Sequence, residues 1–277
     1  MAKSFTTSDN VRLHYTDVGE GDPLFFLPGW SQTAAMFRFQ LEEFSNTHRC
    51  LALDWRGHGE SDKPNGGYRH SRLAMDLKEW LDDLNVESAT LIGHSMGAKV
   101  IWNFWELFQS HRISRLVTID QTPRILNDPS WTEQERLNYG GHMEFASLEA
   151  LCHRLASPEG VDATREFLPN LFTRRVSQDI LEWVIEENLK MPRRHAAFLL
   201  RETALSDSRD ILSTINIPTL VMAGEASYPR SQEWIHEQFP SSSFCLIPAS
   251  EGGSHFCFLE NPDLFNQGLR TFLNDSL

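Results

Sequence analysis

Cysteine is scarce in this sequence, and its four copies form neither a ligand set nor a disulfide framework. Zinc cages use closely spaced pairs such as Cys-x-x-Cys, and disulfide-rich domains carry many cysteines in a short chain. The residues Cys50, Cys152, Cys245 and Cys257 show neither pattern. We therefore expect no metal site and four reduced thiols, as in a cytoplasmic protein.

Long apolar runs and positive charge are also lacking. Nowhere do about 18 apolar residues follow one another, as a membrane span requires, and residues 1–10 lack the apolar stretch of a secretory leader. Lys and Arg total 25 against 38 Asp and Glu, so the formal net charge is -13. Nucleic acids and anionic membranes favour basic surfaces. We expect a soluble cytoplasmic protein with no nucleic-acid or membrane partner.

Strand and helix patterns alternate along most of the chain, which predicts an α/β fold with a mostly parallel central sheet flanked by helices. Short apolar or alternating runs bounded by turn residues predict strands at 11–18, 24–27, 50–54, 89–93, 116–119, 219–223 and 244–247. Helical periodicity predicts helices between them at 73–84, 98–108, 232–238 and 262–273.

The strand pattern disappears between residues 122 and 206. Helical stretches replace it at 147–155, 163–171, 180–189 and 195–205. We therefore expect a single domain spanning residues 1–277, with a helical cap at about 122–206 inserted after the strand that ends at Asp120.

A GxSxG pentapeptide, residues 93–97, stands between an expected strand and an expected helix. Small flanking residues permit a sharp turn that holds the central serine in a strained conformation with its hydroxyl exposed. We interpret Ser95 as a nucleophile. An ordinary serine at a helix N-cap is the alternative interpretation.

A serine hydroxyl is a weak nucleophile unless a base accepts its proton and an acid orients that base. Eleven histidines compete for the role of base. His255 is the best placed, because it lies in a glycine-rich loop after the last expected strand and before the final helix. We interpret His58 and His94 as structural or pocket-lining residues.

Four segments together resemble the α/β-hydrolase superfamily, and the resemblance covers nearly the whole chain outside the cap. They are LPGW at 27–30, DWRGHGES at 54–61, GHSMG at 93–97 and GSH at 253–255. The resemblance implies the α/β-hydrolase fold. It also implies an oxyanion hole formed by the backbone amides of Trp30 and Met96.

The acid departs from the pattern of that family. Family members commonly place it after the strand expected at 219–223, often as Gly-x-x-Asp, but this chain reads GEASYP over 224–229. Two carboxylates can replace it, Asp120 and Glu225. We favour Asp120, because it ends an apolar strand and should emerge at the carboxyl edge of the sheet, where ligand sites form. A capping aspartate and a solvated glutamate are the alternatives.

Large apolar side chains in the cap and its approaches would suit a small hydrophobic or aromatic substrate. We select Trp30, Trp131 and Trp183 as candidate substrate-binding residues. Apolar residues at helical spacing ordinarily pack inward, so core packing is the alternative for each of them.

These residues predict a serine hydrolase that cleaves a carboxylic ester or lactone through a Ser-His-Asp triad and an acyl-enzyme, without a cofactor. A runner-up belongs to another reaction class. The chain also resembles cofactor-free dioxygenases that cleave 3-hydroxy-4-quinolones with a His-Asp base, through Gly29-Trp30, residues 54–58, an acid at Asp120 and His255-Phe256. The intact pentapeptide favours the hydrolase, because proton abstraction needs no activated hydroxyl.

Two further hypotheses use the same residues. Haloperoxidase or perhydrolase chemistry would replace water with peroxide in the second step, and a ligand receptor would bind without turnover. The substrate, the choice between ester and lactone, and the oligomeric state are left open.

Overall fold

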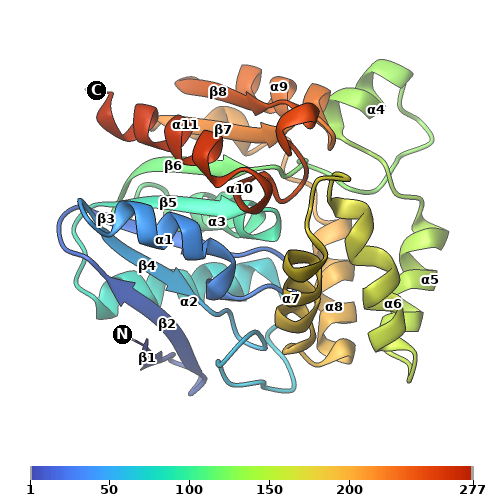
Figure 1. The fold of residues 1–277 in the computed structure, drawn as a ribbon, viewed down its shortest axis with the longest axis horizontal. Helices are drawn as coiled ribbons and strands as arrows, with labels where there is room; N and C mark the ends of the chain where they lie inside the picture. The colour runs from blue at the N-terminus through green and yellow to red at the C-terminus, as the bar shows by residue number, and fades with distance from the viewer. Residues whose placement is uncertain (1, 276–277) are drawn as a thin grey trace.

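An eight-stranded sheet forms the centre of the computed structural model, which describes residues 2–275 (Figure 1). Its order is β1-β2-β4-β3-β5-β6-β7-β8. The pairs β1/β2 and β2/β4 are antiparallel, and the other neighbouring pairs are parallel. The strands are β1 (Ala2–Thr6), β2 (Arg12–Val18), β3 (Pro23–Leu27), β4 (Arg49–Leu53), β5 (Ala89–His94), β6 (Ile113–Ile119), β7 (Thr219–Gly224) and β8 (Ser242–Ile247). The predicted α/β class with a mostly parallel sheet is confirmed.

Helices cover both faces of the sheet, which explains why the central strands are apolar along their whole length. Every residue of β5 and of β7 is buried. One face carries α1 (Arg38–Phe44), α10 (Cys257–Glu260) and α11 (Pro262–Asn274). The other carries α2 (His70–Asp83), α3 (Met96–Phe108) and α9 (Pro229–Gln238). Short 3-10 turns lie at η1 (Ala34–Phe37), η3 (Leu212–Thr214) and η4 (Ala249–Glu251).

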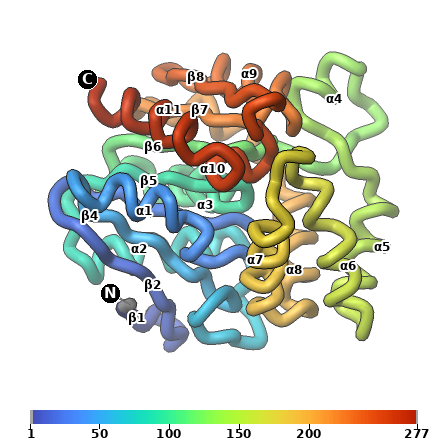
Figure 2. The backbone as a smooth tube through the Cα atoms, in the orientation of Figure 1, coloured from blue at the N-terminus to red at the C-terminus, as the bar shows by residue number. Residues whose placement is uncertain are grey.

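A helical segment connects β6 to β7. Its elements are α4 (Glu133–Tyr139), α5 (Phe145–Leu155), α6 (Gly160–Phe167), η2 (Leu168–Leu171), α7 (Gln178–Leu189) and α8 (Arg193–Leu205). Helices α5 to α8 stand together beyond the ends of the central strands, while α4 packs on α9 (Figures 1 and 2). No helix within residues 2–275 is long and apolar enough to cross a bilayer.

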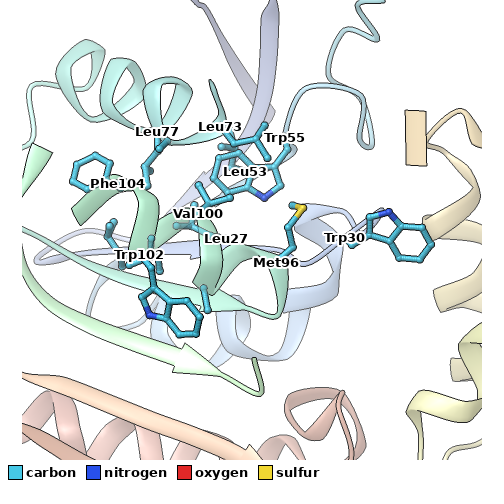
Figure 3. Close-up of a cluster of buried hydrophobic side chains, with 14 of the residues drawn as sticks. Leu27, Trp30, Leu53, Trp55, Leu73, Leu77, Met96, Val100, Trp102 and Phe104 are labelled. Atoms are coloured by element: carbon cyan, nitrogen blue, oxygen red, sulfur yellow. The ribbon is translucent and has the colours of Figure 1, made fainter. Parts of the chain in front are cut away.

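Helix α3 is buried nearly all round, because the sheet, α2 and the helical segment enclose it. Figure 3 shows Val100, Trp102 and Phe104 of α3 among the core side chains, with Met96 at its start. In the same view the Trp30 indole lies apart from the α3 side chains, at the edge of the same cluster, and its Nε1–H donates to the Ala196 carbonyl of α8 at 2.7 Å. The first turn of α3 therefore lies where the core meets the helical segment.

Candidate active site

Ser95 occupies the turn between β5 and α3. Its backbone is held at φ 52° and ψ -123°, a region that residues with a side chain rarely adopt. Its N–H donates to the Ile119 carbonyl of the neighbouring strand at 2.8 Å, which fixes the turn against the sheet. Strain of this kind persists only where the surrounding structure enforces it, and it concentrates at functional sites.

The two glycines of the pentapeptide are required by close packing. A Cβ atom added to Gly97 would lie 2.2 Å from the Leu27 carbonyl oxygen, and one added to Gly93 would lie 2.7 Å from the Ala98 nitrogen. Neither backbone neighbour can move without displacing the sheet or α3. The glycines thus allow α3 to start close to the end of β3.

Asp120 and His255 are in direct contact. Asp120 Oδ2 accepts a hydrogen bond from His255 Nδ1 at 2.6 Å and another from the Ser227 hydroxyl at 2.6 Å. Asp120 Oδ1 accepts from the Gly224 N–H at 3.2 Å. The Asp120 side chain is fully buried. These contacts hold the imidazole with Nδ1 protonated and leave Nε2 as its basic nitrogen.

Glu225 lies elsewhere. It is solvent-exposed, and its Oε2 accepts a hydrogen bond from the Ala249 N–H at 2.8 Å. Of the two carboxylates considered from the sequence, the structure brings Asp120 and not Glu225 to His255 within the described residues.

The Ser95 hydroxyl is directed at Gln121. Its Oγ lies 3.4 Å from Gln121 Oε1, and the described residues contain no hydrogen bond from Ser95 Oγ to the His255 ring. Ser95, Asp120 and His255 nevertheless line one cavity. Catalytic hydrogen bonds are often long or poorly aligned until the substrate binds, so this arrangement is compatible with a Ser95–His255 contact during a reaction.

Two backbone amides beside Ser95 have no acceptor among residues 2–275, namely those of Trp30 and Met96. Trp30 follows β3, and Met96 is the first residue of α3, where a helix leaves its N–H groups unpaired. The positive end of the helix dipole adds to their preference for a negative oxygen. These are the two amides that the sequence predicted for an oxyanion hole.

His94 and His58 are completely buried, and both make hydrogen bonds that support the surrounding loops. His94 Nε2 lies 2.8 Å from the His255 carbonyl, and its ring centroid lies 4.6 Å from that of His255. Burial holds the pKa of His94 well below its usual range, with a smaller contribution from His255. Burial also lowers the pKa of His58 to about 4. Both rings are therefore neutral at pH 7, and His94 supports the loop that carries His255.

The cavity at Ser95 has a free volume of about 90 Å³. Trp30, Gln121, His142 and Tyr228 line it beside the residues described above. Much of the remaining wall is apolar and comes from the helical segment, through Ile125, Met143, Phe167, Leu168, Leu171 and Leu200.

Trp131 and Trp183 lie outside this lining. The Trp131 ring is covered by the guanidinium groups of Arg124 and Arg209, 5.3 and 5.0 Å from its centroid. Trp183 packs on the face of the fold that carries α1, under the guanidinium of Arg38 at 4.2 Å. Of the three tryptophans selected from the sequence as substrate-binding residues, Trp30 alone lines this cavity.

A second cavity adjoins the first and has a free volume of about 300 Å³. His255, Leu171 and Tyr228 border both cavities. The second cavity also contains the polar side chains of Asn170, Ser227 and Ser254. Ser95 is not among its lining residues, so His255 borders both an apolar cavity that contains Ser95 and a more polar one that does not.

Sequence reasoning missed several cavity residues. Gln121 directly follows Asp120 and could have been found from its place at the end of β6. His142 and Tyr228 come from loops, and their rings stack with centroids 4.0 Å apart. No periodicity or motif marks these two positions, because their proximity depends on how the helical segment is folded.

Comparisons with known proteins agree with this architecture. A family model described as alpha/beta hydrolase fold matches residues 22–150. The AB hydrolase superfamily protein YisY of Bacillus subtilis is 26% identical over 99% of this chain and 100% of its own length. Epoxide hydrolase 4 of Mus musculus is 41% identical over 96% of this chain and 77% of its own. An esterase from Thermogutta terrifontis superposes with a TM-score of 0.82 at 25% identity, covering 99% of this chain and 98% of that one.

Proposed function

We propose that this chain, which belongs to the α/β-hydrolase fold family, is a serine hydrolase that cleaves a carboxylic ester or a lactone of a small hydrophobic substrate. One observation carries the proposal. A strained serine in a turn with two closely packed glycines, a histidine paired with a buried aspartate, and the unpaired amide of Trp30 meet at a single, largely apolar cavity, and the unpaired amide of Met96 directly follows the serine. Acyl transfer needs these three elements together.

Each step of the reaction has a residue to perform it. His255 Nε2 takes the proton of Ser95 as Oγ attacks the acyl carbon, and Asp120 stabilises the resulting imidazolium. The amides of Trp30 and Met96 donate to the oxyanion of the tetrahedral intermediate. His255 then protonates the leaving alkoxide and afterwards deprotonates the water that releases the acid.

The two cavities support this order of events. We place the acyl part of the substrate in the apolar cavity, since Ser95 and Trp30 line it. The leaving alcohol and the incoming water both exchange protons with His255, which also faces the more polar second cavity. We infer that water reaches the acyl-enzyme from that side.

Similarity to an epoxide hydrolase suggests another hydrolytic reaction, which the nucleophile disfavours. A serine that opened an epoxide would become an alkyl ether, and water cannot readily cleave an ether. An ester or lactone instead yields an acyl-serine, which water hydrolyses. Ser95 therefore favours acyl substrates.

A dioxygenase that cleaves a 3-hydroxy-4-quinolone remains the second candidate. The contact that favours it is the one between His255 and an acid at the end of β6, because that pair alone could deprotonate such a substrate. The strained conformation of Ser95 has no purpose in that reaction.

We also infer that residues 1–277 form one domain, with residues 122–206 as its cap.

The test compares wild-type protein with Ser95→Ala on p-nitrophenyl acetate and butyrate, followed by intact mass after fluorophosphonate treatment. We expect turnover and a single adduct in the wild type, and neither in the variant. Absence of both in the wild type would overturn the proposal. Oxygen uptake with a 3-hydroxy-4-quinolone, lost in His255→Ala and retained in Ser95→Ala, would then establish the dioxygenase.

A further inference from the structure

Lys99 is a fully buried lysine on α3, one helical turn after Ser95. Its Nζ donates to the Pro123 carbonyl at 3.0 Å, to the Ser206 carbonyl at 3.0 Å and to the Ser206 hydroxyl at 2.9 Å. An ammonium group has three N–H donors, so all three are used. The reaction described above has no role for this residue.

The three acceptors belong to the two ends of the helical segment that connects β6 to β7, hereafter the cap segment. Its entering end comprises residues 121–126, its returning end comprises residues 200–208, and the two ends lie side by side. The Ser208 N–H donates to the Pro123 carbonyl at 3.1 Å. Arg124 Nη1 pairs with Asp207 at 3.1 Å across the same junction. These contacts join the two ends to each other, whereas Lys99 joins both of them to the helix that begins beside the nucleophile.

Residues at both ends of the cap segment line the active-site cavity. Gln121, whose amide oxygen faces the Ser95 hydroxyl, and Thr122 belong to the entering end. Leu200 and Thr203 of α8 belong to the returning end. Asp120 is anchored separately by Gly224 and Ser227, so loosening the junction would move the walls more than the His-Asp pair.

We propose that Lys99 is a positioning residue, which fastens both ends of the cap segment to the nucleophile helix and so sets the width of the cavity in which the substrate binds. Its effect on catalysis rests on the proposed function. Its effect on the junction does not.

The chemistry of the amine gives the fastening a dependence on pH. Burial lowers the pKa of Lys99 to about 7. Asp207 and Glu202 of the returning end raise the pKa, Arg124 of the entering end lowers it, and the buried His70 of α2, with a pKa of about 3, stays neutral. A neutral amine keeps two N–H donors for three acceptors. The junction should therefore loosen as the pH rises through neutrality.

The first experiment measures amide hydrogen-exchange protection factors in wild type and Lys99→Met at pH 6.5 and 8.5. Methionine reproduces the unbranched lysine side chain as far as Cε and removes every donor. We expect protection in residues 121–126 and 203–208 to fall by about tenfold or more in the variant, because it loses all three charge-assisted hydrogen bonds of Lys99. The wild type should lose protection there at pH 8.5, and the variant should not change further. Lys78→Met is the control, because this half-buried lysine of α2 pairs with Asp82 and not with the junction.

The second experiment measures kcat and KM on p-nitrophenyl butyrate over the same range. We expect Lys99→Met to raise KM about tenfold with kcat changed less than about threefold, because the walls move and the His-Asp pair does not. The wild-type KM should rise with pH and the variant's KM should stay flat. Lys99→Gln, with two N–H donors, should give an intermediate KM that is also independent of pH.

Unchanged protection at either end of the segment, or a KM of Lys99→Met that still rises with pH, would overturn the proposal. If Lys99→Met does not fold, Lys99→Gln and Ser206→Ala take its place. Both should lower protection and raise KM, but only Lys99→Gln should remove the pH dependence, because Ser206→Ala removes one acceptor and keeps the amine. If the wild type does not hydrolyse the ester, the proposed function fails, and the protection factors alone decide the role of Lys99.

Discussion

His255 Nδ1 and Asp120 Oδ2 lie 2.6 Å apart, although 135 positions separate the two residues in the chain. The carboxylate reaches the histidine because β6 and β7 are neighbours and both end at the same edge of the sheet. Asp120, with φ 48°, turns its side chain across that edge toward the loop after β8. An acid at the end of β6 can therefore serve the same histidine as an acid at the end of β7.

Replacing this acid should separate the two candidate carboxylates. Asp120→Asn keeps the shape of the side chain but offers an amide N–H to the imidazole, which favours the wrong tautomer, and we expect kcat to fall on the order of 10⁴-fold. Glu225→Gln should change kcat by less than about twofold, since Glu225 is exposed and its carboxylate accepts a hydrogen bond from the backbone amide of Ala249. Steady-state kcat values on p-nitrophenyl butyrate distinguish the two carboxylates. If kcat falls more in Glu225→Gln than in Asp120→Asn, Glu225 is the acid.

The close approach at the nucleophile turn predicts an effect on stability. Gly97→Ala would place a Cβ atom 2.2 Å from the Leu27 carbonyl oxygen, and we expect the free energy of unfolding to fall by about 1–3 kcal/mol, with loss of activity as Ser95 shifts. Gly66→Ala is the matched control, because an added Cβ there meets nothing within 4 Å. Urea unfolding measures both variants. Equal effects would show that the contact at Gly97 is relaxed at little cost.

Buried neutral histidines should make the protein sensitive to mild acid. Burial lowers the pKa of His58 to about 4 and that of His70 to about 3. The unfolded chain then binds more protons below pH 6.5, so their stabilisation is complete above that value and is lost as the pH falls toward the folded pKa. A change from pH 7 to pH 5 should therefore lower the free energy of unfolding by about 2 kcal/mol for each of these two histidines.

Urea titrations at the two pH values test this expectation. His70→Leu should remove its share of the difference between pH 7 and 5, whereas His153→Leu, on the exposed face of α5, should leave that difference unchanged. The same pH dependence in His70→Leu and wild type would argue that other groups are responsible.

The size of the cavity predicts acyl-chain preference. Leu200→Ala enlarges the apolar wall, so we expect the ratio of kcat/KM on p-nitrophenyl octanoate to that on butyrate to rise about tenfold. Because Leu200 is buried, the variant should also lose about 2–5 kcal/mol of stability. Leu205→Ala, on the same helix but 47% exposed, should change neither. An unchanged ratio in Leu200→Ala would place the acyl group elsewhere.

The sequence predicted the central strands and the serine turn because both leave local signals. Parallel strands that are covered on both faces appear in the sequence as continuous apolar runs. The turn at Ser95 requires glycines at a fixed spacing, here Gly93 and Gly97. Asp120 was selected on the position of a strand end, which is also local. The edge strand Ala2–Thr6 and the short helices Arg38–Phe44 and Glu133–Tyr139 were missed, because brief elements show little periodicity.

The cavity wall was harder to predict, for a physical reason. Helical spacing shows that a side chain turns inward, but not which surface it meets. Trp183 turns inward and meets the core beside Arg38, while Leu200 turns inward and meets the cavity. His142 and Tyr228 come together from segments 86 positions apart that have no shared pattern. Their meeting depends on tertiary packing that composition and periodicity do not encode.

The two ends of the cap segment are joined by the hydrogen bond from the Ser208 N–H to the Pro123 carbonyl. A stretch of chain that leaves and re-enters the core at almost the same point places little geometric demand on its own length. Such a stretch can be lengthened, shortened or exchanged for another during evolution while the sheet and the nucleophile turn keep their form. The core sheet thus accepts different segments between β6 and β7. New specificities can be engineered by exchanging this whole segment rather than by altering single side chains.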